Sequence, residues 1–169
     1  MDETSAGVPA GILSRLAALT YDALLVTALL FVATFAVLPL TGGEAITPAT
    51  QGAGAYWYRA WLLVVAFGYF GRSWTRGRTL GMRAWRLRIE NPAGGAPGWA
   101  AALARFGIGV VLSCAAGIGV WLLTRTSWGV RAGGALLVLP AVANYLWILV
   151  DRRGRSLQDR LCRMRLRRV

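Results

Sequence analysis

Residues 16–40, LAALTYDALLVTALLFVATFAVLPL, form a nearly unbroken apolar run that contains a single carboxylate, Asp22. A helix needs about 20 apolar residues to cross a bilayer, so this run is long enough to span one. An acid at such a depth costs about 2.5–3.5 kcal/mol on insertion scales, and it therefore usually faces protein, water or a cation. Asp22 is the first candidate functional residue.

The composition indicates that the rest of the chain also belongs in lipid. The mean hydropathy is +0.51 and 56% of the residues are hydrophobic, yet the formal charge is +12. A soluble domain rarely combines these values. Apolar stretches recur at 56–71, 106–123 and 132–150, and the first of these has a short apolar centre and contains Arg59. We therefore expect an all-α membrane protein, a four-transmembrane-helix bundle, with residues 1–11 as a leader and 12–169 as one domain.

The arginines predict the orientation of these spans. With four spans, 16 of the 19 arginines fall on one side, and only Arg59, Arg125 and Arg131 fall on the other. The positive-inside rule then places both termini, the leader and the central loop in the cytoplasm, in a cell (inner or plasma) membrane. The leader has no basic residue and the run exceeds the 7–15 residues of a signal-peptide core, so we expect the first span to be retained.

Two cytoplasmic segments alternate with the period of a half-buried strand. In the central loop Trp85, Leu87 and Ile89 alternate with arginines, and near the C-terminus Met164 and Leu166 do the same. The two segments could pair as a small cytoplasmic β-ribbon, or they could be amphipathic helices or unstructured basic tails. In either case anionic lipid headgroups are the expected partners of the basic residues Arg83, Arg86, Arg88, Arg163 and Arg165. Nucleic acid is the alternative for any arginine-rich surface, but the juxtamembrane position favours lipid, and we expect no nucleic-acid partner.

The residue types needed for catalysis are scarce. The chain has no histidine and no paired cysteine motif, so we expect neither a metal site nor another cofactor. No phosphate-binding glycine loop follows a predicted strand, and no serine or cysteine stands beside a plausible base. We therefore do not expect an enzyme.

The remaining polar residues predict contacts between helices. Arg15 and Asp22 share a helix face but stand about 10 Å apart, so a direct bond would need a further charged residue between them. The segment after the last span offers Asp151 and Asp159 for this position. Asn144 lies at a depth that could match Asp22, which predicts a polar cluster between the first and fourth helices. A ridge of small residues, Gly109, Ser113 and Gly117, could serve packing within the monomer or a dimer face.

Three short motifs resemble the RDD family of prokaryotic membrane proteins, named for one Arg and two Asp. They are Arg15 followed by Asp22, then Thr79-Leu80-Gly81 before a basic segment, then Leu157-Gln158-Asp159-Arg160 after the last span. The resemblance runs from Arg15 to the C-terminus. It implies that Arg15, Asp22 and Asp159 are the signature residues, with Asp151 as a rival for the third place. Met82 and Gln158 depart from the residues common at their positions, Lys and His, which puts a role for these two in doubt.

Two functions remain open. In the first, Arg15, Asp22 and Asp159 form a buried ionic network in a structural module that binds lipid headgroups or a membrane protein partner. In the second, the resemblance implies monovalent cation/proton exchange, with Asp22 as the ion- or proton-binding carboxylate. The outer halves of the spans offer no polar route across the membrane, so exchange would need a homo-oligomer or a partner.

Overall fold

The computed structural model describes residues 11–44, 46–151 and 154–168, so the expected leader lies almost wholly outside the described residues. The fold is mainly helical. Its elements are α1 (Ile12–Val37), η2 (Leu38–Thr41), α2 (Pro48–Gln51), α3 (Gly54–Thr75), α4 (Leu80–Ala84), β1 (Leu87–Glu90), α5 (Trp99–Leu123), α6 (Trp128–Val150), α7 (Leu157–Leu161) and β2 (Arg165–Arg168).

Three helical segments are long and apolar enough to cross a membrane: Ile12–Thr41, Trp99–Leu123 and Trp128–Val150. Their outward-facing side chains are large and apolar, as in Leu24 (69% exposed) and Phe35 (66%), which is the pattern of a lipid-facing surface. The fourth predicted span corresponds to α3, which is long enough but contains Arg59 and many tyrosines and tryptophans. The expected count of four spans is therefore not confirmed.

The predicted spans agree with the four long helices in position but not at every end. The largest difference is α5, which begins at Trp99 after the N-cap Gly98 rather than at residue 106. The first two turns are rich in alanine and leucine, which favour helix, so the helix starts before the apolar part of the span. As a result Arg105 belongs to a long helix and not to the preceding loop.

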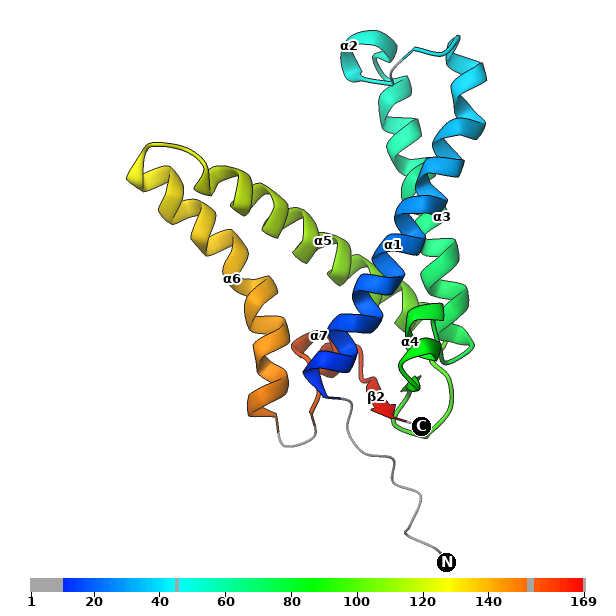
Figure 1. Cartoon of the computed structure of the whole chain (residues 1–169), viewed down its shortest axis with the longest axis vertical. Helices are drawn as coiled ribbons and strands as arrows, with labels where there is room; N and C mark the ends of the chain where they lie inside the picture. The colour runs from blue at the N-terminus through cyan, green and yellow to red at the C-terminus, as the bar shows by residue number, and fades with distance from the viewer. Residues whose placement is uncertain (1–10, 45, 152–153, 169) are drawn as a thin grey trace, which may run out of the picture.

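The long helices form two pairs that diverge from a common base (Figure 1). One pair is α1 with α3, and the other is the hairpin of α5 and α6. The hairpin closes at Gly119 and Gly134, where a Cβ on Gly119 would lie 2.6 Å from the carbonyl oxygen of Gly134. This contact lies outside the ridge expected at Gly109, Ser113 and Gly117, since a Cβ on Gly117 would meet nothing within 4 Å. The small residues that bring helices together are thus on another face of α5.

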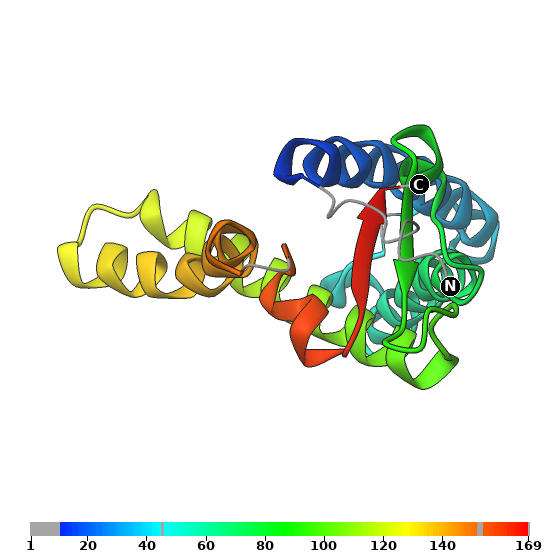
Figure 2. The ribbon, with the colours of Figure 1, turned by 90° about the horizontal axis from the view of Figure 1, so that it is seen from below.

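The base contains the β-ribbon that the alternating residues predicted. β1 and β2 pair antiparallel, with Ile89 opposite Leu166 and Arg88 opposite Arg167, and they lie side by side in Figure 2. Leu87 and Ile89 are fully buried, and they pack in one cluster with Trp74, Met164 and Leu166. Trp85, which was expected within the first strand, instead follows α4 and is 46% exposed.

Each of the two strands is preceded in the chain by the same local structure. Thr79 and Ser156 each cap a short helix, α4 or α7, with a side-chain oxygen. An arginine with positive φ follows each helix, Arg86 (φ 52°) and Arg163 (φ 51°), and turns the chain into the strand. The sequences TLGMRAWRLRIE and SLQDRLCRMRLR also share their first leucine and three arginines, with Arg83, Arg86 and Arg88 at the positions of Arg160, Arg163 and Arg165. The chain thus consists of two similar halves, each with two long helices, a short helix and a strand.

Candidate functional site

The carboxylate of Asp159 is the centre of the site. Asp159 is 0% exposed, and its Oδ2 accepts a hydrogen bond of 2.6 Å from Nη1 of Arg15 in α1. Its Oδ1 accepts a bond of 2.5 Å from Nη1 of Arg105 in α5. Oδ2 also accepts from the backbone N–H of Ser156, which completes the capping box of α7. One carboxylate therefore joins α1, α5 and α7.

The charge state of Asp159 follows from these contacts. Burial alone would raise the pKa of its carboxyl, because it removes water from the charged form. The positive charges of Arg105 and Arg15 and their hydrogen bonds outweigh burial and lower the pKa of Asp159 from 3.8 to about 2. Asp159 is therefore ionised at neutral pH.

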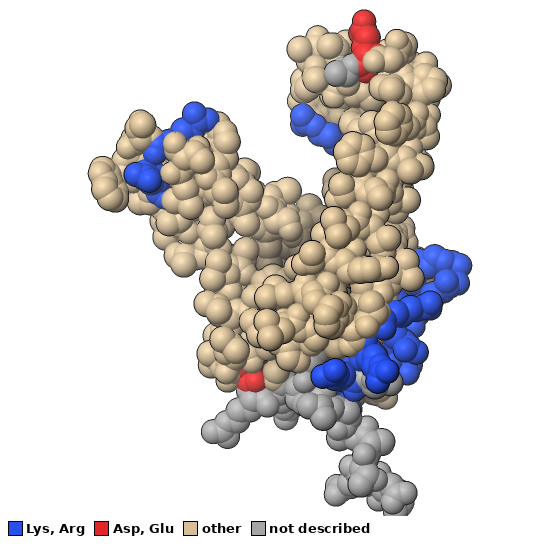
Figure 3. All heavy atoms as spheres, viewed as in Figure 1, with Lys and Arg blue, Asp and Glu red and all other residues tan. Residues whose placement is uncertain are grey.

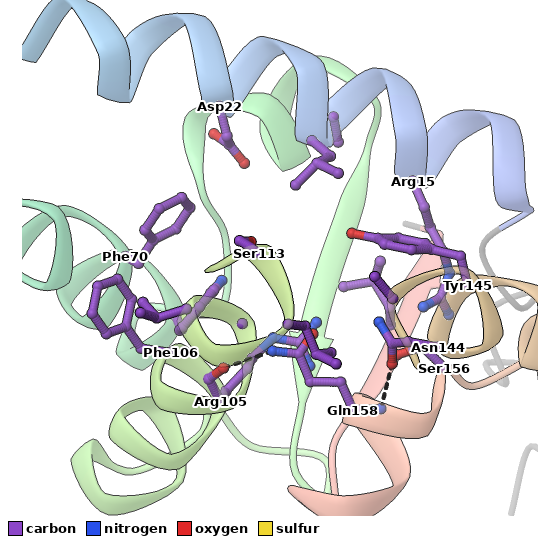
Figure 4. A pocket seen from close by; sticks show the side chains of 18 of the residues that line it. Arg15, Asp22, Phe70, Arg105, Phe106, Ser113, Asn144, Tyr145, Ser156 and Gln158 are labelled. Carbon is purple, nitrogen blue, oxygen red and sulfur yellow. Dashed lines mark hydrogen bonds between the residues drawn. The ribbon is translucent and has the colours of Figure 1, made fainter. Parts of the chain in front are cut away.

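Further polar contacts hold α7 and the residues just before it against the long helices (Figure 4). The backbone N–H of Gln158 donates to Oδ1 of Asn144 in α6 at 2.8 Å. The Gln158 side chain donates from Nε2 to the carbonyl oxygen of Arg105 at 2.6 Å, and Arg15 donates from Nη2 to the carbonyl oxygen of Gly154 at 2.6 Å. We call the set Arg15, Arg105, Asn144, Gln158 and Asp159 the arginine–aspartate network.

Asp22 occupies a separate site in α1, where it holds the start of α4. Its carboxylate accepts hydrogen bonds from the Tyr69 hydroxyl at 2.7 Å, the Thr79 hydroxyl at 2.5 Å and the backbone N–H of Gly81 at 2.9 Å. An added Cβ at Gly81 would overlap the carbonyl oxygen of Ala18, so only glycine permits this approach of α4 to α1. The Thr-Leu-Gly motif therefore supplies a hydroxyl donor, a backbone donor and the space for both.

The structure brings together only part of the expected signature trio. Arg15 and Asp159 are in contact, as expected. Asp22 does not join them, because among the described residues it accepts hydrogen bonds from neutral donors and no ion pair includes it. The expectation of one network containing all three residues is wrong.

The two supporting residues also take other partners than expected. Asp151, the rival for the third signature position, pairs with Arg155 through a bond of 3.0 Å from Nε to Oδ2. Asn144 was expected to form a polar cluster with Asp22, but its side-chain oxygen bonds to Gln158 instead. Asn144 has this partner because α7 folds back beneath the helices and brings its own polar groups to α6, whereas Asp151 pairs within the segment that leads to α7.

Several residues of these sites were missed or misjudged in the sequence. Arg105 and Tyr69 were not predicted as site residues, although they donate to Asp159 and Asp22 respectively. Gln158 was placed in doubt because it departs from the common residue, yet its backbone and side chain both donate. One signal could have predicted α7: Ser156 and Asp159 have the spacing of a capping box before a leucine-rich turn.

The expected headgroup-binding arginines lie on α4, the ribbon and the turns before its strands. Arg83, Arg86 and Arg163 are exposed, whereas Arg88 and Arg165 are half-buried. Figure 3 shows basic side chains gathered at the base of the molecule, with few at the far ends of the helix pairs. We call the exposed arginines of this end the basic platform: Arg72, Arg76, Arg78, Arg83, Arg86, Arg160, Arg163 and Arg168.

A cavity of about 570 Å³ lies between the two helix pairs, directly above the network (Figure 4). Its wall is largely apolar, and Leu19, Phe70, Phe106 and Val110 contribute to it. Arg15, Asp22, Arg105, Asn144, Tyr145 and Gln158 supply polar groups to it. Within the described part of the chain, no group of three His, Cys, Asp or Glu side chains could hold a metal ion.

Comparison with known proteins supports the resemblance seen in the motifs. The model of the RDD family matches residues 9–163, which is nearly the whole chain. No curated protein and no solved structure matches the chain. The family match and the three strongly apolar helices mark the chain as a membrane protein. On this evidence the chain belongs to the RDD family.

Proposed function

We propose that this protein is a multi-pass module of the cell membrane in which the arginine–aspartate network holds a basic cytoplasmic platform for lipid headgroups or a membrane partner. The observation that carries the proposal is Asp159, which is fully buried between arginines of two different long helices. A buried ion pair with this geometry fixes the positions of α1, α5 and α7 relative to one another. Such a structural role explains the buried charges without any catalytic task. The network therefore sets where the platform stands relative to the spans.

The proposed topology has four spans with both termini in the cytoplasm. The ends of α3 and α6 lead through equivalent short helices into paired strands, so these two ends lie on one side. If α6 crosses the membrane, α3 must cross it in the same sense, despite Arg59. The platform then lies on the cytoplasmic side, which agrees with the positive-inside rule.

Cysteine labelling tests this topology. In a chain with Cys114→Ser and Cys162→Ser, we expect an impermeant maleimide added to intact cells to label Glu44→Cys. The same reagent should label Gly95→Cys only after the membrane is broken. Both positions are exposed in the fold. Labelling of Gly95→Cys in intact cells would refute the cytoplasmic placement of the platform.

Lipid binding by the platform follows from its charge and position. Each basic residue near an anionic membrane surface contributes about 1 kcal/mol at physiological salt. Eight exposed arginines on one end exceed what solubility requires, and the described acidic residues Glu90 and Asp151 are each half-buried beside an arginine. The platform therefore keeps a strong positive field.

Thermal stability in nanodiscs tests this binding. We expect phosphatidylglycerol discs to raise the melting temperature above that in phosphatidylcholine discs, and added salt to reduce the difference. Replacing Arg83, Arg86 and Arg163 together by Gln should remove most of the difference. The matched control replaces Arg59, Arg125 and Arg131, the three described arginines outside this end, and should retain it. Equal losses in both triple variants would contradict the proposal.

Cation/proton exchange is the second candidate, because Asp22 contributes to the cavity. Against it, the Asp22 carboxylate already accepts three hydrogen bonds that hold α4. An Asn at position 22 has one acceptor oxygen and an added donor, so it loses part of this arrangement. We expect Asp22→Asn to lower the melting temperature. We expect neither the wild type nor this variant to produce cation-dependent proton flux in liposomes. Robust wild-type flux that disappears in a still-stable variant would establish exchange instead.

A further inference from the structure

The cavity combines a long apolar wall with a polar end. The apolar part is formed by α1, α3 and α5, and Phe70 and Phe106 lie beside each other in this wall, with 6.2 Å between their ring centroids. Its volume of about 570 Å³ falls within the range of sites that hold organic ligands. The two helix pairs diverge above the base (Figure 1), and the molecular surface is hollowed between them (Figure 3), which leaves this region open to lipid.

The polar end of the cavity presents hydrogen-bond donors that the described residues leave unused. Arg105 lies at this end and pairs with the carboxylate of Asp159. Arg105 uses only Nη1 for this contact, and its Nε and Nη2 have no hydrogen-bond partner among the described residues. Asp22 is the other acid of the cavity, but its oxygens are already taken by Tyr69, Thr79 and Gly81.

A second donor at the same end also lacks an acceptor. Trp74 contributes to the cavity and is only 7% exposed, and its Nε1 is buried with no hydrogen-bond partner in the described structure. Its ring lies 5.4 Å from the guanidinium carbon of Arg105. A buried indole N–H normally finds an acceptor, so an acceptor from outside the chain is expected near Arg105.

We infer that this cavity binds one anionic phospholipid of the cytoplasmic leaflet, with an acyl chain along the apolar wall and the phosphate oxygens near Arg105 and Trp74. Phosphate supplies acceptors for the unused N–H groups of Arg105 and Trp74, and guanidinium binds phosphate well. The inference rests on the proposed membrane orientation, which puts the polar end at headgroup depth. It concerns a single internal site, distinct from the exposed arginines of the basic platform.

The test uses a matched pair of variants on α5. Ser113 lines the cavity, whereas Gly117, one turn further along, does not line it, and a Cβ there would meet nothing within 4 Å. Ser113→Phe should therefore fill the cavity, and Gly117→Phe should add the same bulk to an open face. The full-length protein in detergent is titrated with phosphatidylglycerol and with phosphatidylcholine, and bound lipids are counted by native mass spectrometry.

We expect a single tight phosphatidylglycerol adduct on the wild type and on Gly117→Phe, and about tenfold weaker binding of it to Ser113→Phe. Phosphatidylcholine should bind more weakly to all three proteins. A phosphatidylglycerol with a photoreactive group at the end of one chain should cross-link to α5 between residues 106 and 116. The same titration on the triple platform variant separates the two proposals, because the internal adduct should survive there even if headgroup binding is lost.

Three results would overturn the inference. Equal binding to Ser113→Phe and Gly117→Phe would show that the lipid sits elsewhere. Equal binding of both lipids would show that the charge of the polar end does not select the headgroup. Cross-links from a photoreactive residue at position 113 to a second protein chain, in place of lipid, would show that the cavity is filled by another copy.

Discussion

At the scale of single residues, the two buried carboxylates differ in their partners and therefore in how each should respond to substitution. Asp159 is charge-paired with Arg15 and Arg105, whereas Asp22 accepts bonds from neutral donors. Loss of charge at Asp159 leaves two arginines sharing a site without their counter-charge, which is the costlier outcome.

Replacing Asp159 by Asn should strongly destabilise the fold. Breaking a buried ion pair costs about 3–5 kcal/mol, because the remaining charge stays buried and unpaired. We expect a melting temperature in detergent several degrees below that of the wild type. Asp151→Asn is the control, since its pair with Arg155 is partly exposed and surface pairs contribute about 1 kcal/mol or less. Similar losses in both variants would contradict the central role of Asp159.

Stability should also fall in acid because of Asp159. The folded pKa of about 2 lies below the ordinary value of 3.8, so the ionised carboxylate stabilises the folded state fully above about pH 4. This stabilisation, about 2 kcal/mol, is lost as the pH falls through 2. Melting curves between pH 5 and pH 2 should show the decline, and Asp159→Asn should show a smaller one. An unchanged slope in the variant would assign the acid sensitivity to other groups.

Gly81→Ala tests the contact between α1 and α4. An added methyl group would overlap the carbonyl oxygen of Ala18 and lie 2.9 Å from the carboxyl carbon of Asp22, so α4 must move away. We expect destabilisation by about 1–3 kcal/mol, as for other overpacked sites. Gly68→Ala in α3 is the control, because its Cβ meets nothing within 4 Å and alanine favours helix. Equal melting temperatures for the two variants would show that α4 is not held closely.

At the scale of elements, the sequence predicted what depends on periodicity and missed what depends on long-range contact. The long apolar runs predicted the positions of the long helices, and the alternating basic segments indicated the ribbon as one alternative, because lipid and a half-buried sheet each impose a regular pattern. The short helices α4 and α7 were missed, because five residues are too few to show a helical period. Their stability depends on caps and on Asp22 and Arg15, which lie far away along the chain.

The ribbon register can be tested by paired cysteines in a chain with Cys114→Ser and Cys162→Ser. Ile89 and Leu166 are directly opposite each other in the antiparallel pair, so Ile89→Cys with Leu166→Cys should form a disulfide on mild oxidation. Ile89→Cys with Arg167→Cys should not, because adjacent residues of a strand point to opposite faces. Gel mobility under non-reducing conditions reads the result. Equal cross-linking of both pairs would mean that the register slips.

At the scale of the whole molecule, the family resemblance predicted only some of the contacts between buried residues. Motif order placed Asp159 beside Arg15, since both were expected at the cytoplasmic ends of helices. It could not predict that Asp22 serves α4, because proximity in sequence to Arg15 carries no information about which helix face meets a later segment. The close packing of α5 against α6 likewise depends on Gly119 and Gly134, which no local pattern distinguishes from the other glycines.

The two-half organisation predicts that the halves can assemble from separate chains. A break within the exposed turn at residues 92–95 leaves α1, α3, α4 and β1 in one fragment and α5, α6, α7 and β2 in the other. We expect co-expressed fragments to purify together through a tag on either one. Arg15→Gln should weaken this association, because it removes one partner of Asp159, and Arg59→Gln should not. Retention of the complex in Arg15→Gln would show that the ribbon and helix contacts suffice.

The bond between Arg15 and Asp159 joins residues separated by 144 positions. During synthesis Arg15 enters the membrane early, and Asp159 emerges only after α6 has been translated. The bond that fixes the start of α1 to α7 must therefore wait until every long helix has been made, although Asp22 can bind α4 earlier. Helix insertion and final docking are separate events in time, and the docking step is available only to a chain whose last short helix has been made. A cell could thus distinguish an unfinished chain from a finished one by whether the N-terminal end of α1 is held by Asp159.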